Sequence, residues 1–460
     1  MNISFEADSK KNFYKELLAL AIPIGLQNLL TALIGATDAL MLGRLTQDSV
    51  SAVSLANQIV FIMNLFVGAV VGGGGVLLAQ YWGKGDKGMV KNLFCMIIKW
   101  TFGITIVFFA LAMLIPEQLM QLYTKDAALI EIGTSYIRAV APSYLFTGIA
   151  QCYFVMMKLE GKARKSVYIS IFTLVADVSL DIFLIYGLIG NFEGFGAIGS
   201  AYSTVFVELC ALIFCVAESH RKDGIHPDIN GFKWYSRTIS KDFFKIALPM
   251  LGSSLAWGLG FSMHSLIMGH LGSDATAAAS ITSVAQEIIT CVCKGISAGA
   301  GIMVGKLLGK SMFDKAKEYG GRFCRVAIVT GLVHMLLLCI LAPIVTAFFV
   351  LSETAKQYLI LMLVFSGIYV FAYSINTIIV CGVFPAGGDA NYDAISVFLA
   401  SWCFALPLAL LGAFVFQLPV IVIYILMCSD EIVKLPWLYG RYKKYKWLNN
   451  LTQSEAVSKL

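Results

Sequence analysis

The stretch at residues 21–43, AIPIGLQNLLTALIGATDALMLG, decides the fold of this chain. At a rise of about 1.5 Å per residue, an apolar segment of this length crosses the hydrocarbon core of a bilayer as one helix. It carries a proline near its start, Pro23, and a single carboxylate near its end, Asp38. An aspartate at the centre of a membrane helix costs about 2.5–3.5 kcal/mol, so Asp38 requires a functional or structural reason.

The pattern of this stretch returns 226 residues later, at 247–269, as ALPMLGSSLAWGLGFSMHSLIMG. Pro23 aligns with Pro249, and Asp38 aligns with His264. The Gly-Lys pairs at 83–84 and 309–310 match at the same offset. We therefore expect a parallel repeat of two six-span halves, related by a pseudo-twofold axis along the membrane normal.

The composition is that of a membrane protein. Of 460 residues, 58% are hydrophobic and only 13% are charged, whereas soluble domains carry about 25% charged residues. The predicted spans lie at 17–43, 52–81, 93–115, 129–157, 166–189, 196–219, 243–270, 278–305, 323–350, 357–384, 392–415 and 418–438. The expected fold class is an all-α membrane protein with twelve transmembrane helices in two pseudo-symmetric six-helix lobes around a central cleft.

The basic residues predict the topology. Of the 34 lysines and arginines, 28 fall on one side of the predicted spans, and this count includes Lys434 with the C-terminal tail. Because basic loops stay in the cytoplasm, both termini are expected there, in a multi-pass protein of the cell membrane. The expected divisions are an N-lobe at 1–219, a cytoplasmic linker at 220–242, a C-lobe at 243–440 and a basic cytoplasmic tail at 441–460.

Several classes of protein are not expected. The net charge of +6 comes from short loops, so it does not indicate a nucleic-acid partner. The eleven cysteines lie scattered in apolar runs without a metal-binding or redox spacing. The chain has no catalytic triad and no nucleotide-binding loop, so we expect neither an enzyme nor a bound cofactor. The expected partners are small amphipathic or cationic molecules and the lipid bilayer, and the chain is expected to be a monomer.

Four acids and a hydroxyl fall in the outer half of the first six spans. Asp177 and Asp181 are four residues apart and share one helix face, as do Thr204 and Glu208. Together with Asp38 they offer hard oxygen ligands, which suit a small cation such as Na⁺. Like charges held close together disfavour full ionisation, so the group can instead take up a proton.

Structural alternatives remain open for each of these residues. Asp38, and the pair Asp177 and Asp181, can be hydrogen-bonded acids with a structural role only. Glu208 can face a cytoplasmic vestibule, and Thr204 can bond its own helix backbone. His264 is either a second proton site, since histidine titrates near neutral pH, or a neutral buried side chain bonded to a neighbour.

A substrate cavity is predicted from methionine and aromatic side chains, which adapt to varied ligands. Its candidates are Met63, Phe154, Trp257, Glu287 and Lys294. Glu287 and Lys294 share a face but lie two turns apart, roughly 10 Å, so we do not expect a direct pair. Plain packing is the alternative for the apolar members.

The chain resembles the multidrug and toxic compound extrusion (MATE) transporters, in particular their DinF-like branch. The resemblance rests on the motifs of the first span, GKG at 83–85, VSLDIFLIYG at 178–187, GAIGSAYST at 196–204 and GVFPAGGD at 382–389. It implies an antiporter that exports amphipathic, often cationic compounds in exchange for inward H⁺ or Na⁺, by alternating access.

The resemblance also assigns residues. It places the family's N-lobe cation site, where Na⁺ is possible, at Asp38, Asp177, Asp181 and Thr204, and the kink of the first helix at Pro23. This chain departs from the family at three positions. Asp177 stands where asparagine is usual, Trp257 where one branch has an essential glutamate, and Val397 where many relatives have an aspartate. The last departure implies that the C-lobe has no acid.

Two rival functions remain. A flippase for lipids or lipid-linked oligosaccharides has a related architecture, and such proteins place cationic side chains in the central cavity. Apart from residues counted with the cytoplasmic loops and tail, the basic residues inside predicted spans are Lys99, Arg138 and Lys294. A sensor or channel without pumping is the second rival, and measurable uphill transport distinguishes it from an antiporter.

Overall fold

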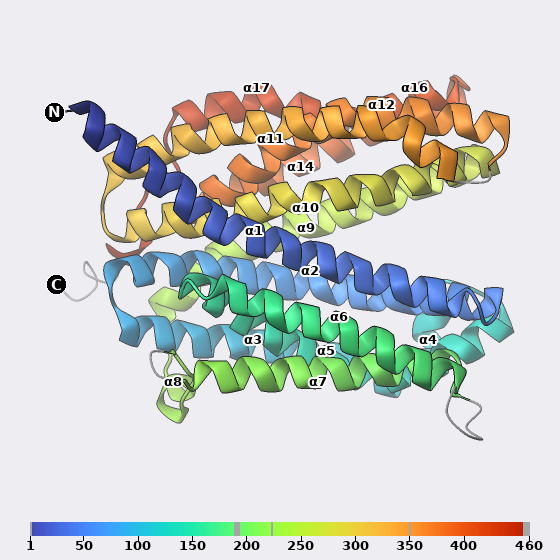
Figure 1. Ribbon diagram of the computed structural model, residues 1–460, viewed down its shortest axis with the longest axis horizontal. Helices are drawn as coiled ribbons and strands as arrows, with labels where there is room; N and C mark the ends of the chain where they lie inside the picture. The colour runs from blue at the N-terminus through green and yellow to red at the C-terminus, as the bar shows by residue number, and fades with distance from the viewer. Residues whose placement is uncertain (1, 188–193, 222–223, 349–350, 454–460) are drawn as a thin grey trace. The chain divides into compact units, whose positions relative to one another are not determined.

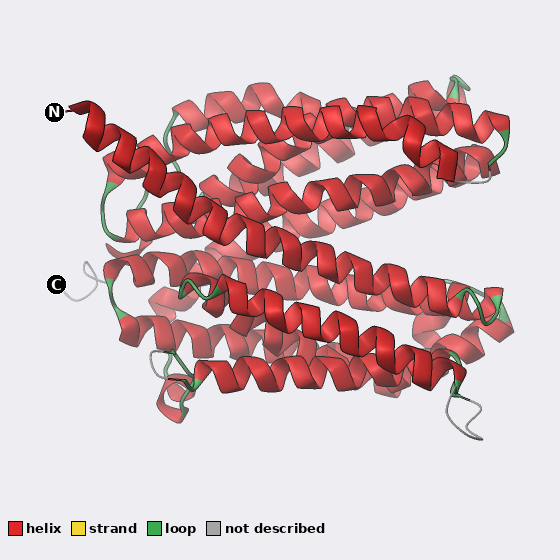
Figure 2. Ribbon diagram, viewed as in Figure 1, coloured by secondary structure: helices red, strands yellow, loops and turns green. Residues whose placement is uncertain are grey.

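The computed structural model describes residues 2–187, 194–221, 224–348 and 351–453. Parts of the predicted linker and tail, at 222–223 and 454–460, lie outside these residues. Within the described residues the chain forms helices joined by turns, without a strand (Figure 2). Eleven helical stretches among them are long and apolar enough to cross a membrane. The predicted all-α membrane class is confirmed.

The helices of the first half follow the predicted spans closely (Figure 1). They are α1 (Asn2–Leu42), α2 (Gln47–Lys84), α3 (Lys87–Leu114), α4 (Pro116–Gln121), α5 (Ala127–Leu159), α6 (Ala163–Tyr186) and α7 (Ala197–Ser219). A short helix, α8 (Ile229–Lys233), lies in the loop before the second half. Pro23 lies inside α1, which continues through it, and the kink there stays a prediction.

The second half has more interruptions. Its helices are α9 (Arg237–His270), α10 (Ser273–Gly309), α11 (Phe313–Phe348), α12 (Glu353–Asn376), α13 (Phe384–Ala386), α14 (Asn391–Val397), α15 (Leu406–Leu410), α16 (Val420–Met427) and α17 (Ser429–Lys443). Three π-helical segments, η1 (Thr377–Val383), η2 (Phe398–Ala405) and η3 (Leu411–Val415), join several of them, and a 3₁₀ turn, η4 (Leu451–Gln453), follows α17. Such widened turns often mark functional or strained places in a helix.

Short polar side chains fix where several helices begin. Asp86 accepts a hydrogen bond from the backbone N–H of Met89, and Asp126 accepts from that of Ala128, both at 2.9 Å. Each carboxylate satisfies an N–H group that the first helical turn leaves without a partner. The twelfth predicted span, 418–438, consists of α16 and α17. In the first turn of α17, Asp430 accepts from the N–H of Glu431, and this local bond competes with a regular helix.

Packing divides the chain into two compact units. Unit 1 consists of Met1–Gly25, Ala79–Gly85 and Arg237–Leu460, and unit 2 consists of Leu26–Leu78 and Asp86–Ser236. The division inside α1 falls two residues after Pro23, and α2 is divided near its end. The first part of α1 and the end of α2 therefore pack with the second half of the chain, while the predicted lobe and linker bounds stay predictions.

Glycines bring α1 and α10 into backbone contact inside unit 1. A Cβ atom added to Gly295 would lie 2.5 Å from the carbonyl oxygen of Ala21, and one added to Gly25 would lie 3.3 Å from that of Cys291. In lipid, where water does not drive helices together, small residues let helices approach and pack in this way. Nearby, α11 and α12 lie side by side (Figure 1) and contribute Leu338 and Leu359 to a buried apolar core.

We predict that Gly295→Ala lowers the free energy of unfolding by about 1–3 kcal/mol, because its methyl group overlaps the α1 backbone. Chemical unfolding in detergent measures this loss. Gly103→Ala is the matched control, since a Cβ atom at Gly103 meets nothing within 4 Å. Equal stability of the two variants would contradict the α1–α10 contact.

Candidate functional site

Three carboxylates of unit 2 lie together: Asp38 of α1 with Asp177 and Asp181 of α6. One oxygen of each lies within 4.8 Å of an oxygen of the other two. Asp177 and Asp181 are 2% and 1% exposed, and Asp38 is half-buried. The four-residue spacing on α6 puts its two acids on one helix face, so that both meet the acid of α1.

Two contacts hold the helices around these acids. The hydroxyl of Tyr186, at the end of α6, donates to the carbonyl oxygen of Met41 in α1 at 2.5 Å. A Cβ atom on Gly199 of α7 would lie 2.4 Å from the carbonyl oxygen of Leu184 in α6, so the two backbones touch there. The site is therefore built from helices that are fixed to one another close to the acids.

The hydroxyl that contacts the acids belongs to Ser203 of α7. It is fully buried, lies 3.4 Å from an oxygen of Asp177, and also hydrogen-bonds Asp181. The hydroxyl of Thr204 instead donates to the carbonyl oxygen of Ser200 in its own helix at 3.0 Å. One step along an α-helix turns a side chain by about 100°, which separates the two neighbours. Ser203 and Thr204 are neighbours in the SAYST sequence, and sequence analysis selected Thr204 instead of Ser203.

The site has unsatisfied hydrogen-bonding capacity. One carboxylate oxygen of Asp177 and one of Asp181, both Oδ2, are buried and have no hydrogen-bond partner among the described residues. A buried ionised carboxylate without a partner is strongly disfavoured. Three clustered carboxylates form a hard oxygen donor set, which fits a small cation, and a shared proton also relieves the repulsion.

The other predicted coupling residues lie apart from this group. Glu208 is half-buried on α7, one turn beyond Thr204, and is not among the three clustered acids. His264, the pseudo-symmetric partner of Asp38, belongs to α9 in unit 1. Its Nε2 atom is buried and has no hydrogen-bond partner in the described part of the chain. A proton-carrying role for either residue stays a prediction.

The predicted cavity residues are divided between the units. Met63 is fully buried in unit 2, where Phe154 is half-buried, while Trp257 of unit 1 stacks on Phe261 at a ring distance of 6.0 Å. The expectation that Glu287 and Lys294 do not pair is wrong, since Lys294 Nζ lies 2.6 Å from Glu287 Oε1. Two long side chains lying along the helix surface span the axial gap of roughly 10 Å.

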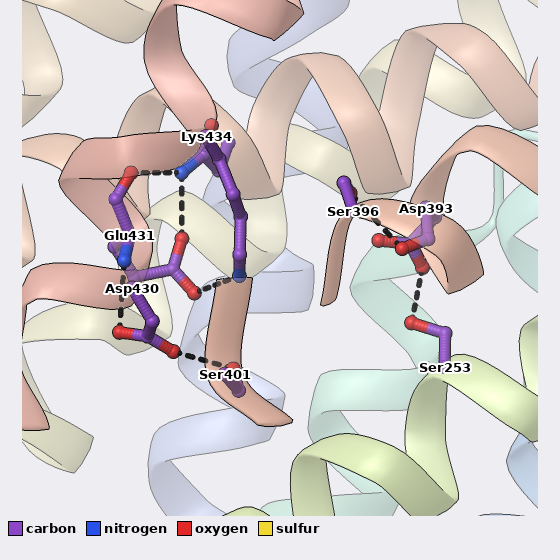
Figure 3. A network of polar contacts seen from close by, with 8 residues as sticks. Ser253, Asp393, Ser396, Ser401, Asp430, Glu431 and Lys434 are labelled. Atoms are coloured by element: carbon purple, nitrogen blue, oxygen red, sulfur yellow. Dashed lines mark hydrogen bonds and ion pairs between the residues drawn. The ribbon is translucent and has the colours of Figure 1, made fainter. Parts of the chain in front are cut away.

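A second polar cluster, in unit 1, was missed by sequence analysis (Figure 3). Glu431 accepts hydrogen bonds from Lys434 Nζ and from Asn376 Nδ2, both at 2.6 Å. Asp430 accepts from Ser401 at 2.8 Å. Lys434 is only 4% exposed, so counting it with the cytoplasmic tail was wrong. Its signal was the three-residue spacing to Glu431, which puts both on one face of α17.

The expectation of a C-lobe without acids is also wrong. Asp393 lies one helical turn before Val397, in α14, and accepts a hydrogen bond from Ser253 at 2.6 Å (Figure 3). The acids of this half thus occupy α14 and α17 rather than position 397. Unlike Asp177 and Asp181, Asp430 and Glu431 have a donor for each carboxylate oxygen. This cluster is a satisfied ion-pair network, whereas Asp177 and Asp181 in unit 2 each keep one oxygen without a partner among the described residues.

Comparison with known proteins places the chain among transporters. The sequence model of the MatE family matches residues 23–183 and 249–411. The two matches begin 226 residues apart, which is the offset of the predicted repeat.

Two curated relatives cover nearly the whole chain. The chain is 22% identical to YisQ, an uncharacterized transporter of Bacillus subtilis, over 94% of each protein. It is 24% identical to NorM of Thermotoga maritima, a probable multidrug resistance protein, over 94% of this chain and 93% of that one.

The fold matches a solved transporter structure. A mutant of the Vibrio cholerae MATE transporter VcmN superposes with a TM-score of 0.88 at 16% identity, over 96% of this chain and 100% of that one. The predicted two-lobed fold is therefore confirmed.

We predict that the unit 2 acids make thermal stability depend on a cation. Replacing choline by Na⁺ at constant ionic strength, or changing from mildly alkaline to mildly acidic pH, should raise the unfolding temperature, because the ligand binds only the folded site. Asp181→Asn removes one negative charge from the site. The unfolding temperature of this variant should therefore be higher in choline at alkaline pH, and it should rise less when Na⁺ is added or the pH is lowered. A full response in that variant would contradict the site. Asp314→Asn, exposed in the first turn of α11, is the matched control.

We predict that Lys434→Met destabilises the protein by about 3–5 kcal/mol, because it leaves the carboxylate of Glu431 buried without its charged partner. The double variant Lys434→Met/Glu431→Gln should recover most of this loss. Chemical unfolding of both variants in detergent measures the difference. Equal stability of the single and double variants would show that the ion pair is not coupled.

Proposed function

Because the chain belongs to the MatE family of transporters, we propose that it is an antiporter that exports amphipathic, often cationic compounds in exchange for inward H⁺ or Na⁺. Members of the family are transporters rather than enzymes. The name of the Thermotoga maritima relative, a probable multidrug resistance protein, supports this substrate class. The observation that carries the proposal is the group of three carboxylates in unit 2 with buried, unpartnered oxygens.

The three carboxylates couple cation binding to the arrangement of α1 in this proposal. With all three ionised, Asp38 of α1 is repelled by Asp177 and Asp181 of α6 in surroundings of low dielectric constant. A proton or Na⁺ removes this repulsion and lets α1 settle against α6. Ser203 contributes a hydroxyl that holds the α6 acids in position. The cation thus binds one arrangement of α1 more tightly than the other, which is what shifts a conformational equilibrium.

The first helix offers a place for the movement. Its first part, to Gly25, packs in unit 1, and the part that carries Asp38 packs in unit 2. Pro23 has no N–H to bond the preceding turn, so α1 bends most easily there. In this scheme the unloaded acids keep the substrate cavity open to the outside. Cation binding bends α1, narrows the cavity and releases the substrate outward.

Further parts of the proposal follow from sequence analysis. Both termini lie in the cytoplasm of a cell-membrane protein that works as a monomer. The substrate contacts Met63, Phe154, Trp257, Glu287 and Lys294. Glu208 and His264 are auxiliary: a proton carrier on the same lobe and a second proton site.

The flippase alternative is less well supported. A cavity that receives a pyrophosphate requires uncompensated cationic side chains. Lys294 is paired with Glu287, and the buried Lys434 is paired with Glu431. Lys99 donates to the carbonyl oxygens of Phe232 and Trp234. These three lysines already have acceptors, which favours export of cations over flipping of an anionic lipid.

We predict that proteoliposomes with this protein export ethidium against its gradient when either a Na⁺ or a proton gradient is imposed. Asp38→Asn should lose this uphill transport, because the amide of asparagine has no negative charge for a proton or Na⁺ to neutralise. The control is Asp314→Asn, which should transport as the wild type does. Retained cation-driven efflux in Asp38→Asn would refute the coupling scheme, and no uphill transport under either gradient would favour the flippase.

A further inference from the structure

The last described residues of the chain, up to 453, fold back onto helix ends of unit 1. Residues 441–453, here called the C-terminal clasp, begin in the basic last turn of α17 and include the turn η4. Trp447 is 0% exposed and Thr452 is 2% exposed, although both lie in a segment that sequence analysis treated as a basic tail. The clasp is therefore packed like a core element rather than like a solvated terminus.

Gln80, in the last turns of α2, is the centre of this packing and is itself fully buried. Its Nε2 donates to the carbonyl oxygens of Ala386 at 2.6 Å and Asn449 at 3.2 Å. Its Oε1 accepts from the backbone N–H of Leu451 at 2.7 Å. One side chain from the first half of the sequence thus holds the clasp and the end of α13 together. A second bond joins Lys84 Nζ to the carbonyl oxygen of Thr452 at 3.2 Å.

The same end of α2 touches α10 through glycines. A Cβ atom on Gly83 would lie 2.1 Å from the carbonyl oxygen of Lys306, and one on Gly309 would lie 1.8 Å from that of Gln80. A Cβ atom on Gly305 would lie 2.8 Å from the Cβ of Ala79. Gly83 and Gly309 are equivalent in the repeat, as are Ala79 and Gly305. The contact is therefore nearly symmetric, and it joins the two repeated halves.

Further bonds hold the clasp to the second half. Arg441 donates to both carboxylate oxygens of Asp389, at 2.8 and 2.6 Å. This carboxylate raises the pKa of the Arg441 guanidinium above its ordinary value, so the pair stays ionised. Asn450 donates to the hydroxyl of Ser311 at 2.8 Å. The clasp thus bridges α2, the α10–α11 turn and the α13–α14 turn.

We propose that the C-terminal clasp, with Gln80 at its centre, is a releasable gate that keeps the basic, cytoplasmic ends of α2 and α10 together while the substrate site is open to the outside. The proposal rests on the antiport function above. In a transporter built from repeats, a contact between equivalent segments on one side of the membrane must break when the site turns to that side. The glycine contact and the clasp form one such contact.

The chemistry of the contact suits repeated opening. Gln80 makes neutral hydrogen bonds to backbone groups, and water can replace each of them when the ends separate, so the net cost of release is small. The helix α2 also passes from unit 2 to unit 1 at Ala79. A movement of unit 2 therefore either bends α2 there or pulls Ala79 and Gln80 away from α10 and the clasp.

A reversible cross-link tests the gate. Ala79→Cys with Gly305→Cys brings two Cβ atoms to 2.8 Å, so a separation of the two helices by about 1 Å gives the distance of about 3.8 Å in a disulfide. We expect oxidation to join α2 to α10, to stop uphill transport, and to allow recovery on reduction. Wild type treated with the same oxidant controls for the native cysteines. A complete cross-link, verified by mass spectrometry, with undiminished transport would overturn the proposal.

A second experiment does not depend on transport. A cysteine introduced by Thr452→Cys reports exposure of the clasp through its reaction with a membrane-impermeant maleimide. Adding Gln80→Leu should raise the labelling rate at least about tenfold, because the clasp loses its central bonds. Gln286→Leu is the matched control, since Gln286 bonds Ser366 and Tyr424 rather than the clasp.

The outcomes of the two experiments separate the two proposals. Equal labelling in Gln80→Leu and Gln286→Leu would overturn the clasp, whether or not the protein transports. Faster labelling in Gln80→Leu, in a protein without uphill transport under either gradient, would support the clasp as a releasable contact and refute antiport.

Discussion

A carboxylate that leaves water for the interior of a membrane protein has to be neutralised, paired or hydrogen-bonded. This protein places three of them within 4.8 Å of one another and gives Ser203 as the neighbouring hydroxyl. In the proposed antiporter, a proton or Na⁺ offsets this cost. Because one acid is on α1 and two are on α6, the charge that relieves the repulsion in that scheme also changes how these helices pack, so that binding and movement are one event.

The cluster in the second half shows what a satisfied arrangement looks like. Glu431 has Lys434 and Asn376 as donors, and Asp430 has Ser401 and a backbone N–H. Here the compensating charge is a permanent part of the chain, so the network fixes α17 against α12 and η2. The two halves share a repeat and an apolar frame. The acids of the first half keep oxygens without a partner among the described residues, whereas Glu431 of the second half is ion-paired with Lys434.

Small residues let the helices of unit 1 pack closely. Glycines let α1 touch α10 at Gly295 and let the end of α2 touch α10 at Gly309. Both α1 and α2 belong partly to unit 1 and partly to unit 2. In the proposed antiporter, these two helices link Asp38 in unit 2 to the clasp around Gln80 in unit 1.

Sequence by itself determined the spans, the repeat and the meeting of Asp38, Asp177 and Asp181. Long apolar runs leave few foldings in lipid, helical periodicity fixes which side chains share a face, and charge inside such a run is conspicuous. Tertiary structure decided what depends on the rotation and distance of neighbouring helices: Ser203 rather than Thr204 beside the acids, and Lys434 buried rather than in the tail. It also decided the burial of Gln80, an ordinary polar residue in sequence. Its partners lie over three hundred residues away, and only packing brings them together.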